Sequence, residues 1–168
     1  MRVAVFVDGA NYTYMQRNLG WHVDTRKLLD YCARFGTIDD AYYYTGTDAS
    51  SDSQQGYLTA LTHMGYALVT KPVKVIYDSE TDSSIRKANL DVEIVLDMFT
   101  TIDTYDMAVL VSGDGDFKRA LELLRARGKK FKVIATDGLV AREIRGICGM
   151  HYVKLEDIRD EVEKVERG

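Results

Sequence analysis

The sequence predicts an α/β protein with a doubly wound, mainly parallel sheet of five or six strands and helices on both faces. Three observations lead to this fold class. Short apolar runs of strand length alternate with segments of helical periodicity along the whole chain. The runs are continuous in hydrophobicity, as in strands that are covered on both faces. Segments rich in glycine and aspartate follow the runs at residues 2–7 and 106–111, where such sheets place their sites.

Length and composition favour a single domain over residues 1–168. Of these residues, 46% are hydrophobic and 29% are charged, which is ordinary for a globular protein. No apolar run approaches the ~20 residues of a membrane span, and residues 1–8 lack the features of a signal peptide. Cys32 and Cys148 lie in apolar helical patterns and are expected to be buried and reduced. We therefore expect a cytoplasmic protein without a membrane partner.

The first half of the chain is predicted to contain three strands and three helices. Strands are expected at residues 2–7, 41–45 and 66–69. Helices are expected at residues 12–17, 25–35 and 50–64. Asp24 is a suitable N-cap for the second helix, and Pro72 breaks the third strand. The tyrosines at 42–44 are interpreted as strand packing and not as a platform for base stacking.

The second half continues the alternation of extended and helical segments. Extended segments are expected at residues 73–77, 106–111, 131–135 and 151–153. Helices are expected at residues 87–99, 118–125 and 139–148. A charged C-terminal helix is expected within residues 156–168. Residues 78–84 contain no apolar side chain and are interpreted as a mobile loop.

Four aspartates are expected to gather at the carboxyl edge of the predicted sheet. Asp8 directly follows the first strand, and Asp114 and Asp116 follow the fourth. If these two strands are neighbours, their carboxyl ends bring Asp8 and Asp114 together. Asp91 lies near the start of the helix at 87–99, on the face that points towards the sheet. The plainer alternative is that Asp116 only caps the following helix.

This clustering of carboxylates predicts a divalent metal site. Carboxylates that lie close together repel one another unless a cation joins them or one takes up a proton. Oxygen ligands without cysteine or histidine select Mg²⁺ or Mn²⁺ over zinc. Such ions activate water and offset charge on phosphoryl oxygens, so the predicted reaction is metal-assisted phosphodiester hydrolysis. The net charge of −4 argues against coating of duplex nucleic acid by bulk charge.

Three motifs resemble those of a known family. They are DGANY at residues 8–12, KANLDV at 87–92 and SGDGDF at 112–117. Together and in this order they resemble the NYN domain family, in its LabA-like branch of the PIN-like nuclease fold. The resemblance covers nearly the whole chain. It implies a doubly wound parallel sheet and a ribonuclease that depends on Mg²⁺ or Mn²⁺.

The resemblance also implies roles for individual residues. The acidic cluster of the family, which supplies catalytic residues and metal ligands, corresponds to Asp8, Asp91, Asp114 and Asp116. The substrate-binding polar and basic positions correspond to Asn11, Ser112 and Lys87. Single-stranded RNA is the expected substrate, because a concave acidic site offers no long basic track for a duplex. No organic cofactor is expected, and a second copy of the chain is a candidate partner.

Three other classes of protein compete with this interpretation. A haloacid-dehalogenase phosphatase needs a second aspartate two residues after Asp8, where this chain has Ala10. A response-regulator receiver needs its phosphoacceptor after the third strand, where Thr70 and Lys71 stand. The third alternative is a non-catalytic NYN module that binds RNA or a protein partner in a regulatory role.

Overall fold

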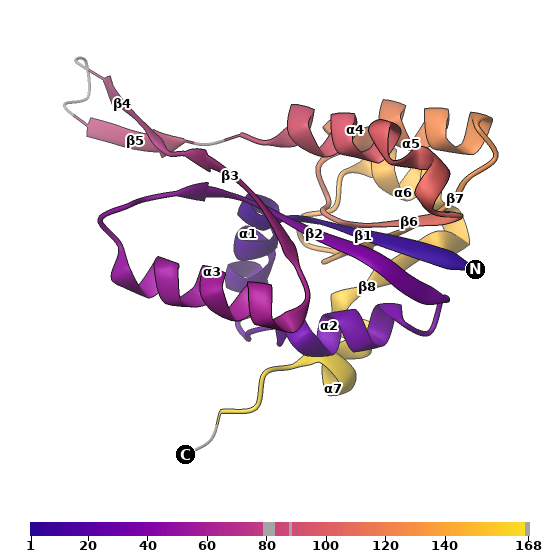
Figure 1. Ribbon diagram of the computed structural model, residues 1–168, viewed down its shortest axis with the longest axis horizontal. Helices are drawn as coiled ribbons and strands as arrows, with labels where there is room; N and C mark the ends of the chain where they lie inside the picture. The colour runs from indigo at the N-terminus through magenta and orange to yellow at the C-terminus, as the bar shows by residue number, and fades with distance from the viewer. Residues whose placement is uncertain (79–82, 88, 167–168) are drawn as a thin grey trace.

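A six-stranded parallel sheet forms the centre of the molecule (Figure 1). The computed structural model describes the backbone of residues 1–78, 83–87 and 89–166, and the side chains of these residues outside 74–87. The strands lie in the order β3-β2-β1-β6-β7-β8. Their bounds are Arg2–Asp8 (β1), Thr37–Thr47 (β2), Ala67–Pro72 (β3), Met107–Val111 (β6), Lys130–Ala135 (β7) and Tyr152–Lys154 (β8). This confirms the predicted doubly wound fold.

Helices cover both faces of the sheet. In Figure 1, α4 and α5 lie on one face, and α2 and α3 lie on the other. The helices are Gly9–Leu19 (α1), Thr25–Cys32 (α2), Asp52–Met64 (α3), Asp91–Thr100 (α4), Lys118–Ala126 (α5), Arg142–Cys148 (α6) and Arg159–Val162 (α7). Short 3₁₀ turns occupy Ile102–Thr104, Gly115–Phe117, Gly149–His151 and Leu155–Ile158. Within the described chain, no helix has both the length and the apolar character needed to span a bilayer.

The two central strands carry the most deeply buried side chains. All five residues of β6 are buried, and in β1 only Arg2 is exposed. The continuous apolar runs in the sequence therefore correspond to strands covered on both faces. β1 and β6 pair in parallel, with Val7 opposite Val111. This register makes the next residues, Asp8 and Ser112, emerge side by side at the carboxyl edge.

The predicted helix at 87–99 is wrong at its start. Lys87 ends strand β5 (Ser83–Lys87), which pairs antiparallel with β4 (Lys74–Asp78) in a separate two-stranded sheet. α4 begins only at Asp91, because the side chain of Asn89 accepts a hydrogen bond from the Asp91 N–H (2.8 Å). Lys87 therefore does not lie one helical turn before Asp91. The predicted mobile loop overlaps both strands of this hairpin, and its residues 79–82 lie outside the described chain.

The predicted charged helix at the C-terminus is also wrong in extent. A 3₁₀ turn is followed by the four-residue helix α7, and the backbone becomes extended at Glu163. Glu163 forms an antiparallel bridge with Val23, and the Lys164 N–H donates to the carbonyl of His22 (2.8 Å). Of the two valines in this segment that the sequence suggests for docking on the body, Val162 is fully buried and Val165 is exposed. Pairing with the loop before α2 has overridden the helical pattern of the sequence.

Two polar contacts fix α4 over the carboxyl edge of the sheet. The hydroxyl of buried Tyr44 in β2 donates to Asp97 (2.9 Å), and Lys71 of β3 forms an ion pair with Glu93 (3.1 Å). The sequence pattern of α4 predicts that Glu93 and Asp97 are solvated, but both are half-buried and partnered. Burial and the nearby Asp97 carboxylate raise the pKa of Tyr44, which keeps its hydroxyl protonated as a donor. The start of α4 is thereby held in place.

Replacing Tyr44 by phenylalanine should destabilise the protein by about 1–2 kcal/mol, because the half-buried Asp97 carboxylate loses its donor. Chemical denaturation would measure this loss. Tyr42→Phe is the matched control, since the hydroxyl of the half-buried Tyr42 makes no hydrogen bond to the described residues. Equal stability of the two variants would show that the Tyr44–Asp97 contact does not anchor α4.

Candidate metal centre

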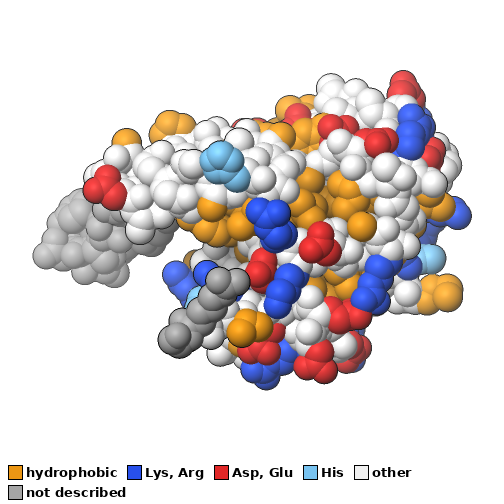
Figure 2. Space-filling model, turned by 60° about the horizontal axis from the view of Figure 1, so that its bottom comes forward, with side chains coloured by type: hydrophobic (Ala, Val, Ile, Leu, Met, Phe, Trp, Pro, Cys, Tyr) orange, Lys and Arg blue, Asp and Glu red, His pale blue; other side chains and the backbone are white. Residues whose placement is uncertain are grey.

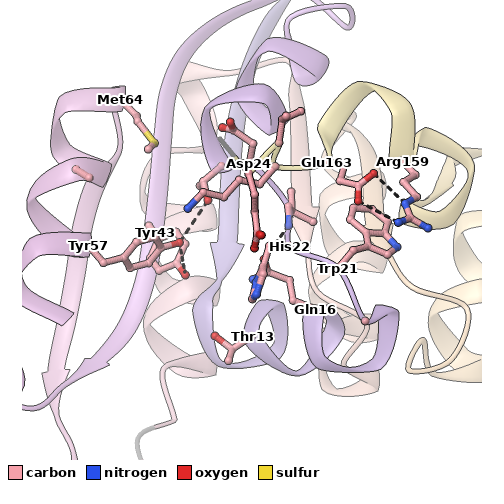
Figure 3. Close-up of a pocket in the computed structure, with 17 residues that line it drawn as sticks. Thr13, Gln16, Trp21, His22, Asp24, Tyr43, Tyr57, Met64, Arg159 and Glu163 are labelled. Atoms are coloured by element: carbon pink, nitrogen blue, oxygen red, sulfur yellow. Dashed lines mark hydrogen bonds and ion pairs between the residues drawn. The ribbon is translucent and has the colours of Figure 1, made fainter. Parts of the chain in front are cut away.

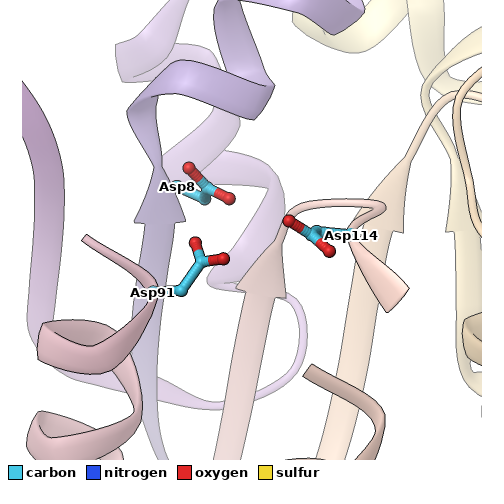
Figure 4. Close-up of side chains that lie close together, drawn as sticks. All are labelled: Asp8, Asp91 and Asp114. Carbon is cyan, nitrogen blue, oxygen red and sulfur yellow. The ribbon is translucent and has the colours of Figure 1, made fainter. Parts of the chain in front are cut away.

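Three aspartates from separate elements converge at the carboxyl edge of the sheet (Figure 4). Asp8 ends β1, Asp91 begins α4 and Asp114 lies in the loop after β6. One carboxylate oxygen from each residue lies within 4.8 Å of the others. β1 and β6 are neighbours in the sheet, so Asp8 and Asp114 lie close together, as the sequence predicts.

Asp8 is the most buried of the three acids, with 7% of its surface exposed. One of its oxygens accepts a hydrogen bond from the Ser112 hydroxyl (3.0 Å), and the other accepts from the Asn11 N–H (3.3 Å). Burial is the largest influence on the pKa of Asp8 and raises it, and the charge of Asp114 acts in the same direction. The hydrogen bonds lower the pKa, but it stays above its ordinary value. Asp8 also serves as the N-cap of α1, so its position is fixed by the fold.

Ser112 and Asn11 join the two chain segments that carry Asp8 and Asp114. The hydroxyl of Ser112 is completely buried, and it accepts from the Asp114 N–H (3.2 Å) while it donates to Asp8. The side-chain oxygen of Asn11 accepts from the Gly113 N–H (2.9 Å). A Cβ atom at Gly113 would lie 2.9 Å from Val140 Cα, so glycine allows this close packing. The contacts of Ser112 and Asn11 position the acids.

Asp91 shows the electrostatic cost of the cluster. Burial raises its pKa to about 6, and the charges of Asp8, Asp114 and Asp116 act in the same direction. Among the described residues, no basic side chain forms an ion pair with any of the three clustered acids. The excess negative charge can be relieved by a proton on Asp91 or by a bound cation.

The structure places two further predicted site residues, Asp116 and Lys87, in different ways. Asp116 is exposed, and its N–H donates to a carboxylate oxygen of Asp114 (2.9 Å). Its charge contributes to the raised pKa of Asp91, but its carboxylate is not among the converging oxygens. Lys87 is placed only by its backbone in β5, and its side chain lies outside the described residues.

The acids line a cavity of about 450 Å³ whose walls also include Ala10, Asn11, Tyr14 and Asn89. Sequence reasoning assigned no role to Tyr14 or Asn89. Asn89 lies just before α4, and its side-chain oxygen accepts from the N–H of Asp91, the first residue of the helix, which helps to position Asp91. An asparagine two residues before a helix acid is a recognisable signal for such a turn.

A larger cavity of about 1150 Å³ lies on the far side of α1, against α3 and the C-terminal segment (Figure 3). Three of its charged side chains are engaged in structural contacts, since Glu163 pairs with Arg159 (3.0 Å) and Asp24 caps α2. Asp8, Asp91 and Asp114 are the one group of three potential metal ligands found among the described residues. We therefore place the functional site in the smaller cavity.

The donor set of this cavity fits a hard divalent cation. All three converging groups are carboxylates, and neither a cysteine nor a histidine lies among them. Such oxygen donors suit Mg²⁺ and Mn²⁺, whereas zinc sites use nitrogen and sulfur ligands. A cation would also remove the repulsion that raises the pKa of Asp91.

A doubly wound sheet with three aspartates clustered at its central carboxyl edge is the arrangement expected of a PIN-like nuclease fold. The chain belongs to the NYN domain family, whose sequence model matches residues 2–156. It is 46% identical over 169 residues to the low amplitude and bright protein LabA of Synechococcus elongatus, across 99% of this chain and 90% of that protein. A crystal structure of a Vibrio parahaemolyticus protein of unknown function shares the fold. It has a TM-score of 0.80 and 24% identity, and the match covers 96% of this chain and 95% of that one.

In the absence of metal, the stability of the folded protein should fall as pH rises from about 4 to above 6. The pKa of Asp91 in the folded state, about 6, lies above its ordinary value of 3.8, so the folded state binds a proton that the unfolded chain releases. Asp91→Asn should remove the part of this fall that Asp91 causes and should stabilise the protein at pH 7.5 by about 1 kcal/mol. This free energy is smaller than the pKa shift alone implies, because solvent screens the partly exposed carboxylate.

Thermal melts in chelator across this pH range would measure the effect. Asp116→Asn is the control, because Asp116 is exposed and lies outside the group of three. A wild-type stability that rises with pH through this window would contradict the proposed repulsion. Adding Mn²⁺ should stabilise the wild type more than Asp91→Asn.

Proposed function

We propose that this protein is a ribonuclease that hydrolyses single-stranded RNA with the help of Mg²⁺ or Mn²⁺. The observation that carries the proposal is the convergence of Asp8, Asp91 and Asp114 at the carboxyl edge of a NYN-family sheet. These three residues would hold the ion. When bound, it would supply an activated water and offset the negative charge on the phosphoryl oxygen.

The protein's own residues prepare the site for this chemistry. Ser112 and the Asn11 N–H fix both oxygens of Asp8, and the backbone N–H of Asp114 is held by Ser112. Because these carboxylates are already ordered, they need little rearrangement when a cation binds between them. Asp116, at the rim, adds negative charge and orders the Asp114 loop through its N–H. The role of Asp116 in the proposal is to support the ligands.

Two features support a single strand as the substrate. The candidate cavity is narrow, about 450 Å³, and its converging side chains are acidic. On the face that carries α2, α3 and α7, which Figure 2 brings forward, acidic and basic side chains are interspersed and form no continuous basic track. A duplex is held mainly by such tracks along its phosphates.

The reducing cytoplasm is the location that we propose for this protein. The buried thiols of Cys32 and Cys148 are free, which supports this placement.

Cleavage of a labelled RNA pool by the wild type should require Mg²⁺ or Mn²⁺ and should stop in chelator. Asp114→Asn should reduce the rate by about 100-fold or more, because it removes a ligand charge from the site. Asp160→Asn, the same substitution on exposed α7, should cleave like the wild type. Equal rates for wild type and Asp114→Asn would assign the cleavage to another site or another protein. Mn²⁺ binding without any cleavage would favour the non-catalytic module.

Ser112→Ala separates a positioning role from a substrate-binding role. Loss of the buried hydroxyl removes a donor to Asp8 and an acceptor for the Asp114 N–H. We expect kcat to fall by about 10- to 100-fold while KM stays unchanged. Steady-state kinetics with a short RNA would test this. A raised KM with unchanged kcat would instead place Ser112 in contact with the substrate.

A further inference from the structure

One exposed aromatic side chain lies beside the acidic centre. Tyr14 of α1 is 61% exposed and lines the same cavity as Asp8, Asp91 and Asp114. Single exposed apolar residues are common and carry no meaning by themselves. Tyr14 differs from the other tyrosine of α1 in its surroundings. The Tyr12 hydroxyl is buried and bonded to Thr25 (3.0 Å), whereas the Tyr14 hydroxyl has no hydrogen-bond partner among the described residues.

A basic side chain accompanies this ring. The guanidinium of Arg17 lies over the Tyr14 ring, 5.6 Å from its centroid. Arg17 is exposed and makes no ion pair within the described chain. Its charge is therefore free to meet a phosphate, while the ring remains available to a flat, apolar group. An aromatic ring with a neighbouring arginine is a combination that binds unstacked bases and their phosphates.

The two side chains share one face of α1 with the acidic centre. Ala10, Tyr14 and Arg17 are spaced at i, i+4 and i+7, and Ala10 also lines the cavity. At 1.5 Å per residue, the backbone of Tyr14 lies about 9 Å along the helix axis from Asp8. The ring and the carboxylates therefore border the same small cavity from neighbouring turns of the chain.

The helix that carries the pair is rigidly mounted. Asp8 caps its start, and Tyr12 and Met15 are buried beneath it. Gly20 ends the helix in a left-handed conformation with φ of 77°. The distance from Tyr14 to the acids is thus set by the fold and not by a loop. Precise placement of this kind is what a substrate-positioning residue needs.

We propose that Tyr14 stacks on the base next to the scissile phosphate and that Arg17 binds a phosphate of the same strand. Tyr14 is then a positioning residue that selects unpaired nucleotides, because a base inside a duplex does not expose its face. The inference rests on the proposed function, since it takes the substrate to be RNA. It adds a specificity element on α1 to the acids at the sheet edge.

The test measures binding separately from cleavage. Labelled twelve-nucleotide oligoadenylate would be titrated at two salt concentrations against proteins that carry Asp114→Asn, so that the strand stays intact. Tyr14→Ala should weaken binding about tenfold without changing the salt slope, and Tyr14→Phe should restore it. Arg17→Ala should weaken binding and reduce the slope of log affinity against log salt by about 0.7.

Arg34→Ala is the matched control. Arg34 also lies over a tyrosine ring three residues before it, Tyr31, at 4.6 Å, but it follows α2, away from the acids. Its replacement should leave affinity and salt slope unchanged. Wild-type affinity in Tyr14→Ala, or no binding of the strand by any variant, would overturn the inference.

Cleavage by proteins with native Asp114 distinguishes the two proposals. If cleavage depends on metal but binding does not depend on Tyr14, the stacking role of Tyr14 is refuted and the proposed nuclease activity is retained. Tyr14-dependent binding without cleavage would support the platform and refute the nuclease. In that case the RNA would be bound by a non-catalytic NYN module.

Discussion

The parallel pairing of β1 with β6 is the constraint on which the rest of the site depends. Its register sets Val7 opposite Val111, and the polar residues that follow emerge side by side from a fully buried pair of strands. Ser112 can reach Asp8 only because of this register. A slip of one residue would turn the side chains to opposite faces and separate them. The apolar core of the two strands therefore determines the geometry of the acids.

The third acid is added by an independent set of contacts. α4 is held at the site by the Tyr44–Asp97 hydrogen bond and the Lys71–Glu93 ion pair, and the Asn89 side chain accepts from the N–H of its first residue. These contacts hold Asp91 against the repulsion of its neighbours, which is visible in its raised pKa. A protein that maximised stability would not gather unpaired carboxylates at a half-buried edge. The structure tolerates this local cost at the place where a cation would remove it.

The sequence predicted the parts of this structure that depend on local patterns. Continuous apolar runs identified β1 and β6, and the aspartates after them were expected to meet. The errors arose where pairing with another segment of the chain outweighed the local helical pattern. Lys87 pairs opposite Lys74 in a hairpin, and Glu163 pairs with Val23, more than a hundred residues away. The inward contacts of buried Ser112 likewise depend on a neighbour that only the folded sheet supplies.

The position of β1 in the sheet also affects the order in which the molecule can assemble. This strand is synthesised about a hundred residues before β6, yet one of its edges is paired only by residues 107–111. Until that segment has emerged from the ribosome, the strand, with its apolar centre at residues 3–7, keeps one row of N–H and C=O groups open. Contacts this distant in sequence form slowly, and unpaired strand edges favour aggregation. The interval before β6 closes the centre of the sheet is therefore the stage of synthesis at which this chain is most open to aggregation.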